Sequence, residues 1–353
     1  MKEKIKDALL GMGRGGLPDK DVLKTIISLK DEELSGALMA MADEKRREHY
    51  GKKVYLRGLI EFSNFCMRNC KYCGIRGKNK NSERYRLSKD EIIECCKRGY
   101  EIGYRTFVLQ SGEDCHYGDE TMVGIIEAIK TYFPDSAVTL SIGEKTEETY
   151  RAYYEAGADR YLLRHETASA ELYDEVHEGM HLESRLECLD RLKRIGYQIG
   201  AGFMVGLPGQ TDENLAEDLL LLMKMQPHMI GIGPFIPHAD TPFRDCPKGD
   251  LEKTVKMLAL ARIMVPKALI PATTALGTAD SHGRELGLMA GANVLMPNLS
   301  PMEVRKKYAL YDNKLCTGEE SASEKEIIGK RIESAGYELD MSRGDHIDWR
   351  KKQ

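Results

Sequence analysis

Apolar residues recur along the chain with two different periods. In residues 1–50 they follow helical spacing without any run typical of a strand, at Leu9, Val22, Ile26, Leu29, Leu34, Leu38 and Met41. From residue 53 onward, short β-rich runs alternate with amphipathic segments. The pattern predicts a helical N-terminal extension over 1–50 and then a strand–helix repeat. The predicted strands are Val54–Phe62, Thr106–Gln110, Ala137–Ile142, Arg160–His165, Gln198–Val205, Met229–Ile232, Ala268–Thr273 and Ala292–Met296.

Helix starts between these runs carry capping signals. Ser88 and Glu91 form a capping box, and Thr146 and Thr211 are each followed by two acidic residues. Strand–helix units with right-handed crossovers favour an α/β fold, a (β/α)8 TIM-type barrel over 51–300. Chain order alone does not separate a barrel from an open sheet, but no dinucleotide-binding fingerprint supports the open sheet. Residues 301–353 are polar apart from one helix near 323–335, and we expect them to form a C-terminal cap and tail.

Composition and charge exclude several functional classes. The 353 residues contain 52 Lys+Arg and 56 Asp+Glu, a net charge of -4 that disfavours nucleic-acid binding. The longest apolar run, Leu219–Met223, is far shorter than the ~18 residues that cross a membrane. The first ten residues carry charges where a signal peptide needs an apolar core. We therefore expect a cytoplasmic protein, with no nucleic-acid or membrane partner, whose nine cysteines stay reduced.

Three cysteines lie on one predicted loop directly after the first strand. Cys66, Cys70 and Cys73 have C-x3-C-x2-C spacing, with Tyr72 before the last. Three thiolates can bind three irons of a 4Fe–4S cube and leave the fourth iron open to an added ligand. A closed zinc site would need a fourth Cys or His, and none occurs nearby before Cys95 and Cys96. Closed zinc and three unligated thiols remain the alternatives.

The fourth predicted strand carries an unusual pair of cations. With the strand period of two, Arg160, Leu162, Arg164 and Glu166 share one face. If that face is the barrel lumen, the buried guanidinium groups cost several kcal/mol (roughly, per ion) unless paired. This placement implies an anionic ligand or a carboxylate partner. The alternative places both arginines outside and packs Leu162 against a helix.

The motif C-x3-C-x-Tyr-C after the first strand of a barrel resembles the radical S-adenosylmethionine (SAM) superfamily. From about residue 50 to 311 the chain is similar to the FeFe-hydrogenase maturases of that superfamily. The stretches that carry the similarity are LQSGED (109–114), YLLRHETA (161–168), GAGFMVGLPGQT (200–211), GIGPFIPHADTP (231–242), IPATTALGT (270–278) and GANVLMPN (291–298). The resemblance implies one 4Fe–4S cluster whose open iron binds SAM, and reductive cleavage of SAM to a 5′-deoxyadenosyl radical.

The resemblance also implies roles for individual residues. Backbone carbonyls of Ser111, Gly112 and Glu113 would receive the SAM amino group, Glu166 the ribose hydroxyls and Arg185 the carboxylate. The other implied cofactor-binding residues are Tyr72, Gln110, Ser141 and Met204, with Tyr72 and Met204 on the adenine side. The implied substrate-binding residues are Arg160, Arg164, Thr273, Thr274, Met296, Tyr308 and Tyr311. Without the resemblance, the two threonines are more typical of strand-end hydrogen bonding and Met296 of a core.

The implied activity lies in assembly of the hydrogenase active-site cluster. The substrate would be a small iron carbonyl cyanide bound to cysteine, supplied by a tyrosine-cleaving partner maturase, and the radical would attack the cysteine sulfur. The implied partners are other hydrogenase maturation proteins and a reducing electron donor. Two alternatives stay open: an amino-acid mutase resembling methylornithine synthase, which GIGPFIPH and PATTALGT disfavour, and a metal or cluster scaffold without turnover.

Two further features bear on partners and cofactors. Some of these maturases carry a second cysteine triplet near the C-terminus, but here no cysteine follows Cys316, so we expect one cluster only. A basic segment on the long loop after the first strand could attract an anionic substrate or a partner protein, or simply be a solvated face. Its residues are Arg76, Lys78, Lys80, Arg84 and Arg86.

Overall fold

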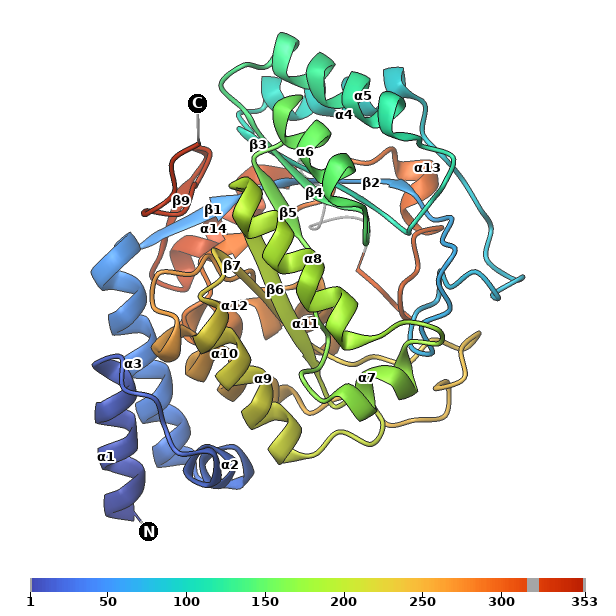
Figure 1. Cartoon of the computed structure of the whole chain (residues 1–353). Helices are drawn as coiled ribbons and strands as arrows, with labels where there is room; N and C mark the ends of the chain where they lie inside the picture. The colour runs from blue at the N-terminus through green and yellow to red at the C-terminus, as the bar shows by residue number, and fades with distance from the viewer. Residues whose placement is uncertain (1, 316–323, 352–353) are drawn as a thin grey trace.

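The computed structural model describes residues 2–315 and 324–351, so Cys316 and Ser323 lie outside the described residues. In this part of the chain, parallel strands follow one another in sequence order around a barrel, with helices outside them (Figure 1). The main sheet consists of β2 (Gly58–Ser63), β3 (Thr106–Ser111), β4 (Ala137–Ser141), β5 (Arg160–Leu162), β6 (Gln198–Val205) and β7 (Met229–Pro234). A second sheet has the order β8 (Val294–Leu295), β1 (Lys53–Leu56), β9 (Glu338–Asp340).

Backbone hydrogen bonds outside the regular strands close the ring. β1 and β2 are consecutive stretches separated by Arg57; β1 pairs with β8 and β2 pairs with β3. Between β7 and β8, Leu269 bridges Met229 and Pro271 bridges Val294. The barrel prediction is confirmed, but Ala268–Thr273 is not a regular strand. Proline has no N–H to donate, so the ladder is reduced there to isolated bridges.

The outer helices begin where the capping signals predicted. Ser88 and Glu91 form the reciprocal capping box, and Thr146 and Thr211 are N-caps. The helices are α4 (Lys89–Glu101), α5 (Asp119–Tyr132), α6 (Glu147–Glu155), α7 (Ala170–Val176), α8 (Leu182–Ile195), α9 (Asp212–Met225), α10 (Leu251–Met264), α11 (Thr274–Ala279), α12 (Gly283–Met289), α13 (Met302–Arg305) and α14 (Lys325–Ser334). No helix among the described residues is long and apolar enough to cross a membrane.

Residues 2–50 form α1 (Lys2–Gly13), α2 (Lys20–Ser28) and α3 (Glu32–Tyr50), which stand against one side of the barrel (Figure 1). α2 packs on α9, where Lys20 Nζ lies 2.7 Å from carboxylates of both Glu213 and Glu217. α3 packs on α10. Every residue of α10 from Thr254 to Met264 is buried, because this helix lies between α3 and β7. A helix buried all round in this way needs a second layer outside it.

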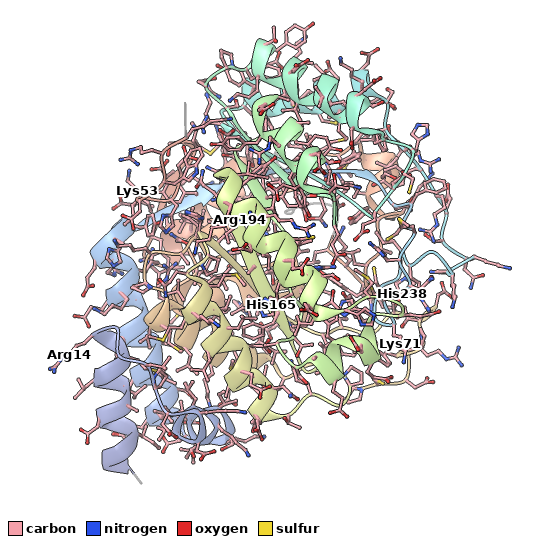
Figure 2. All side chains as sticks on the ribbon, in the orientation of Figure 1. Arg14, Lys53, Lys71, His165, Arg194 and His238 are labelled. Atoms are coloured by element: carbon pink, nitrogen blue, oxygen red, sulfur yellow. The ribbon has the colours of Figure 1, made fainter. Side chains whose placement is uncertain are left out.

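The C-terminal segment returns to the amino end of the barrel strands. β9 adds to β1 in parallel, with Lys53 opposite Glu338. Beyond β9, the carbonyl of Arg343 accepts a hydrogen bond from Thr106 Oγ1 at the start of β3 (2.9 Å). In Figure 2, the labelled residue Lys53 lies on the side of β9. The labelled residues Lys71 and His238 lie on the opposite side of the molecule. The long loop after β2 and the C-terminal segment therefore close opposite ends of the barrel.

Candidate active site

The three predicted cysteines lie on the loop that leaves the carboxyl end of β2, and each is partly buried. Backbone N–H groups of Arg68 and Glu113 donate to Cys66 Sγ, each at 3.4 Å. Burial, reinforced by the charge of Cys66, raises the pKa of Cys70 to about 12, while the charge of Arg185 acts in the opposite direction. Burial and the charges of Cys70 and Cys66 raise the pKa of Cys73. The three thiols are therefore close enough to influence one another.

This donor set fits the cluster better than a single ion. Within residues 2–315 and 324–351, no three His, Cys, Asp or Glu side chains converge as a single bound ion requires. A cube places one thiolate on each of three different irons, so its ligands need not meet at one point. The N–H groups directed at Cys66 suit a negatively charged sulfur. Cys66, Cys70 and Cys73 could thus hold a 4Fe–4S cluster.

The loop approaches the end of β3 closely, and a glycine permits it. A Cβ on Gly112 would lie 2.2 Å from the carbonyl oxygen of Phe65 and 2.6 Å from Cβ of Cys66. Only a residue without a side chain can occupy this position unless the loop moves. The predicted Ser111-Gly112-Glu113 segment is therefore brought directly against the cysteine loop.

The end of α7 holds the cysteine loop on its other side. The N–H of Lys71 donates to the carbonyl of Val176 (2.8 Å), and the Tyr72 hydroxyl lies 2.9 Å from Nε2 of His177. Nδ1 of His177 lies 3.1 Å from the carbonyl of Tyr173, an acceptor, so Nδ1 carries the proton and Nε2 accepts from Tyr72. Burial lowers the pKa of His177 to about 3, so the ring is neutral near pH 7. His177 was not predicted as a site residue.

The basic segment of the loop is largely engaged within the protein. Arg76 and Lys78 pair with Glu178, which follows α7, and Arg86 pairs with Asp114. Arg84 donates to backbone carbonyls of its own loop. Most of these cations therefore stabilise the loop, and the prediction that they attract a partner is not tested.

A chain of alternating charges links the loop to α8. Glu113 Oε2 lies 2.6 Å from Nε of Arg68, and Glu113 Oε1 accepts from the N–H of Glu144 (3.2 Å). Glu144 in turn lies 2.6 Å from Nε of Arg185, whose Nη1 donates to the carbonyl of Arg164. Arg68 and Glu144 were missed from sequence. Their positions, in the cysteine loop and directly after β4, are the signals that could have found them.

Glu166 combines an unusual backbone with an unpartnered side-chain oxygen. Its φ is 66°, in the left-handed region that non-glycine residues seldom adopt. One carboxylate oxygen lies 3.1 Å from Nε of Arg164, whereas Oε2 is buried without a hydrogen-bond partner among the described residues. An unsatisfied buried acceptor is costly, which points to a donor that arrives with a ligand. The implied contact with ribose hydroxyls would satisfy it.

An apolar cluster lies beside the loop and Glu166. Met204 on β6 packs with residues of α7 and of the loops after β6 and β7, and the ring of Tyr72 packs against the same cluster. Its other members are Leu172, Val176, Leu207, Phe235, Phe243 and Cys246. The two residues implied for the adenine side are thus brought together, 132 positions apart in sequence, on a surface suited to a flat apolar ring.

The segment after α13 contributes buried groups to the same end of the barrel. Gln110 Nε2 donates to the hydroxyl of Tyr308 (3.3 Å), and Ser141 lies opposite Gln110 in the β3–β4 register. Burial and the nearby charge of Glu61 raise the pKa of Tyr308. Tyr311 is partly buried, and burial raises its pKa. A buried Lys314–Glu61 pair (2.5 Å), also missed from sequence, fixes this segment over the barrel.

Some implied substrate residues have structural partners instead. Thr273 accepts from the N–H of Leu276 as the N-cap of α11, and Thr274 Oγ1 accepts from Arg284. Met296 packs on the Tyr50–Tyr55 cluster beside an internal cavity of about 20 Å³. These contacts leave their predicted substrate roles untested.

Arg160 is placed differently from the expectation. It is fully buried, and its Nη2 lies 2.6 Å from Asp345 Oδ1 and 2.7 Å from the carbonyl of Arg343. Both partners belong to the segment that closes the amino end of the strands, opposite the cysteine loop. The charge thus has the carboxylate partner that its burial implied, and the structure does not bring Arg160 to the site with Arg164 and Glu166.

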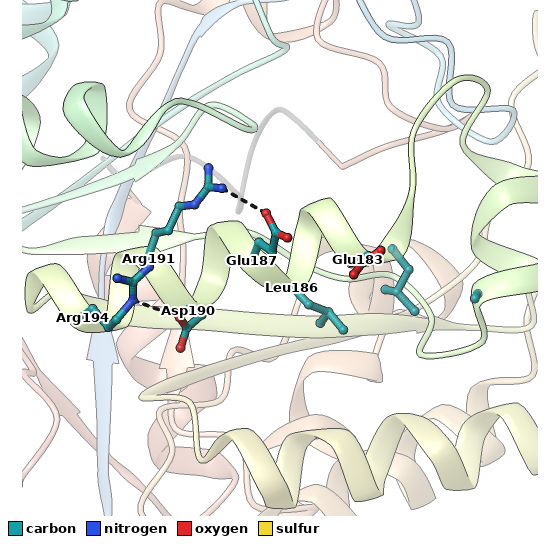
Figure 3. Close-up of a pocket in the computed structure, with 8 residues that line it drawn as sticks. Glu183, Leu186, Glu187, Asp190, Arg191 and Arg194 are labelled. Atoms are coloured by element: carbon teal, nitrogen blue, oxygen red, sulfur yellow. Dashed lines mark hydrogen bonds and ion pairs between the residues drawn. The ribbon is translucent and has the colours of Figure 1, made fainter.

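A wide hollow on the surface lies away from these residues (Figure 3). It is an open surface groove of about 630 Å³ along the outer face of α8, and it includes none of the predicted site residues. Salt bridges between Arg191 and Glu187 and between Arg194 and Asp190, each 3.0 Å, run along it. Charged pairs of this kind are ordinary on exposed helices, so chemistry is better sought at the cysteine loop.

Comparison with known proteins decides the family. Residues 60–222 match the model of the Radical SAM superfamily. Over 317 residues the chain is 48% identical to the "[FeFe] hydrogenase maturase subunit HydE" of Thermotoga maritima, covering 90% of each protein. The chain belongs to the HydE family of radical SAM enzymes.

Relatives outside the HydE family share the fold. The chain is 31% identical to "3-methylornithine synthase" of Methanosarcina barkeri, over 91% of this chain and 89% of that protein. The crystal structure of methylornithine synthase (PylB) superposes with a TM-score of 0.85 at 27% identity, covering 94% and 97% of the two chains. The structure of the hydrogenase maturase HydG gives 0.81 at 19% identity, covering 97% and 77%. The HydE family thus shares its barrel with an enzyme of amino-acid chemistry and with another maturase.

Proposed function

We propose that this chain acts in assembly of the FeFe-hydrogenase active-site cluster, on a small cysteine-bound iron carbonyl cyanide, with one 4Fe–4S cluster held by Cys66, Cys70 and Cys73. The observation that carries the proposal is that Tyr72 of the cysteine loop packs against the apolar cluster of Met204, whose N–H donates to the carbonyl of Glu166 (3.1 Å). The HydE relative supports the choice of reaction. When bound, the cluster supplies an electron to SAM at its open iron, and SAM supplies the 5′-deoxyadenosyl radical.

The chain's own residues orient SAM. Glu166 Oε2 accepts from a ribose hydroxyl and so gains the partner that it lacks among the described residues. Tyr72 and Met204 pack against adenine, and Arg185 pairs with the SAM carboxylate. Backbone carbonyls of the Ser111–Glu113 segment, with Gln110 and Ser141 alongside, receive the amino group. The apolar cluster around Met204 excludes water from the nucleoside.

Other residues hold the substrate beyond SAM. Arg164 provides a guanidinium beside Glu166, 31% exposed and able to pair with an anionic group. The remaining contacts are Thr273, Thr274, Met296, Tyr308 and Tyr311. Arg160 is paired with Asp345 at the opposite end of the barrel and is not among the proposed substrate contacts. The reaction takes place in the cytoplasm with a reducing electron donor, and another hydrogenase maturase supplies the substrate.

The first test is formation of 5′-deoxyadenosine by anaerobically reconstituted, reduced protein. We expect the native chain and Cys188→Ala to form it, because Cys188 lies on α8 outside the loop, and we expect Cys70→Ser not to. A maturation mixture that lacks only this protein should then yield active hydrogenase when the native chain is added. Native protein with full iron content that restores no hydrogenase activity would refute the proposal.

A second candidate is an amino-acid mutase, favoured by the close superposition on methylornithine synthase. This enzyme class would use the same cluster and SAM with an amino-acid substrate. Incubation of the reduced, SAM-loaded protein with lysine separates the candidates. Formation of methylornithine, without restored hydrogenase activity in the mixture, would select the mutase.

A further inference from the structure

Glu166 stands at the centre of a strained turn. The N–H of Thr167 donates to the carbonyl of His165 (2.8 Å), a bond that spans two residues, and φ of the central Glu166 is 66°. These two features define the γ-turn with a positive central φ, which is rare and strained. Such a conformation persists only where the surroundings over-determine it. What holds this turn therefore matters for the position of the Glu166 carboxylate.

Backbone hydrogen bonds from β6 stabilise part of this turn. The N–H of Glu166 donates to the carbonyl of Gly202 (2.9 Å), and its carbonyl accepts from the N–H of Met204 (3.1 Å). A Cβ on Gly202 would lie 2.0 Å from the carbonyl oxygen of Gly231, so β6 approaches β7 too closely here for a side chain. These bonds fix Glu166 itself but do not hold the residues on either side of it.

Two buried side chains hold both flanks of the turn. Nδ1 of His165 accepts from the N–H of Gly202 (3.3 Å), so the ring proton is on Nε2, which donates to Asp218 Oδ1 (3.2 Å). The same Asp218 oxygen accepts from the N–H of Ala168 (2.6 Å). One carboxyl oxygen from α9 therefore binds the residue before Glu166 and the residue two positions after it.

Burying the polar His165–Asp218 pair costs free energy of folding. His165 and Asp218 are fully buried, and neighbouring Leu215, Leu219 and Leu222 of α9 are apolar. Burial lowers the pKa of His165 to about 3 and raises the pKa of Asp218. The charged form of each side chain is therefore disfavoured. An apolar residue at 218 would pack equally well in this layer but could not bind the flanks of the turn.

We propose that His165 and Asp218 are positioning residues, which hold the Glu166 turn so that its free carboxylate oxygen meets the ligand. This inference rests on the proposed function in one respect, that the ligand at Glu166 is SAM. Loss of either positioning residue lets the turn relax to an ordinary backbone conformation and moves the carboxylate, while the cysteine loop keeps its own anchors on α7.

The test measures SAM affinity of anaerobically reconstituted protein by equilibrium dialysis, with iron content and melting temperature as checks. Asp218→Ala and His165→Phe should bind SAM at least tenfold more weakly with native iron content. Asp218→Asn, which keeps the accepting oxygen, should bind within threefold of native. The matched control is Leu219→Ala, the next residue of α9 and also buried, which should lower the melting temperature but not the affinity.

A double variant separates positioning from general loosening. Because the pair acts through Glu166, adding Asp218→Ala to Glu166→Ala should cause no further loss of affinity. Native affinity in Glu166→Ala alone would refute the SAM site of the proposed function. A weakened Glu166→Ala combined with native affinity in His165→Phe, or with losses that add, would refute the positioning role alone. If Asp218→Ala does not fold, the same cycle with His165→Phe decides.

Discussion

Arg160 and Asp345 form an ion pair, 2.6 Å between Nη2 and Oδ1, that joins the start of β5 to the C-terminal segment. The guanidinium also donates to Thr106 and to the carbonyl of Arg343, and Gln198 donates to the same carboxylate oxygen. Three barrel strands are thereby tied to residues that follow β9. The pair makes the end of the chain part of the barrel, which bears on stability and on which residues can belong to the site.

Removing Asp345 should destabilise the fold without affecting SAM. Asp345→Ala leaves the Arg160 charge buried and uncompensated, which costs about 3 kcal/mol. We expect a lower melting temperature and unchanged SAM affinity. The double variant Arg160→Met with Asp345→Leu should recover most of the loss, because replacing both charges removes the uncompensated one. Weaker SAM binding by well-folded Asp345→Ala would instead show that Arg160 acts at the site.

The same pair predicts a pH dependence of stability. Although burial acts to raise it, the charge of Arg160 and the hydrogen bond from Arg343 hold the pKa of Asp345 below its ordinary value. A carboxyl whose folded pKa is depressed stabilises fully above its unfolded pKa of about 3.9 and loses that contribution as pH falls toward the folded pKa.

The measurement is the denaturation midpoint of native protein and Asp345→Asn between pH 7 and 3. The two should differ most above pH 5 and converge as the pH falls below about 4. Asp245→Asn, whose parent side chain is 91% exposed, serves as the control and should parallel the native curve. A difference between native and Asp345→Asn that is constant across the range would contradict the assignment.

Arg160 also shows where sequence reasoning reached its limit. The strand period predicted that Arg160 and Arg164 share one face and implied a partner for each charge. The ion-pair partners are Asp345 for Arg160 and Glu166 for Arg164. It could not say which end of the barrel each would meet, because Asp345 lies 185 positions later in a segment without strong periodicity. By contrast, the cysteine triplet and Tyr72 were found directly, since all four lie within eight consecutive residues of one loop.

Residues that act through tertiary contacts were missed for a related reason. Glu144 and His177 carry no local motif, and their importance depends on Arg185 and Tyr72, which reach them only when the barrel closes. Likewise, the predicted strand Arg160–His165 stops at Leu162, although Leu163 and Glu166 still donate to backbone carbonyls of β6. Helix starts were easier to predict from sequence, since Ser88 and Thr211 each form a capping box with the residue three positions later.

Two glycines with similar backbone angles allow the effect of backbone strain to be distinguished from that of a steric clash at the site. Gly143 (φ 79°) would place a Cβ 1.9 Å from Cγ of Glu113, whereas Gly179 (φ 73°) has open space around it. Alanine at either position should cost about 1 kcal/mol in backbone strain. Only Gly143→Ala should also displace Glu113 and weaken SAM binding several-fold. Equal SAM affinity in both variants would mean that Glu113 does not contribute to the cofactor site.

His177 provides the remaining prediction. His177→Phe keeps a ring that can stack on Tyr173, 4.0 Å away, but removes the acceptor of the Tyr72 hydroxyl. A hydroxyl left unsatisfied in this half-buried place costs about 1–3 kcal/mol. We expect a lower denaturation midpoint and weaker SAM binding with native iron content, because Tyr72 loses its fixed position but the cysteines do not.

The double variant Tyr72→Phe with His177→Phe decides whether the hydrogen bond is responsible. Removing both partners leaves no unsatisfied group, so the midpoint should return to within about 1 kcal/mol of native. SAM affinity should recover with it, since a phenylalanine ring can pack on Met204 as tyrosine does. If the double variant is as unstable as the sum of the single ones, His177 stabilises the loop through its contact with Tyr173 and not through Tyr72.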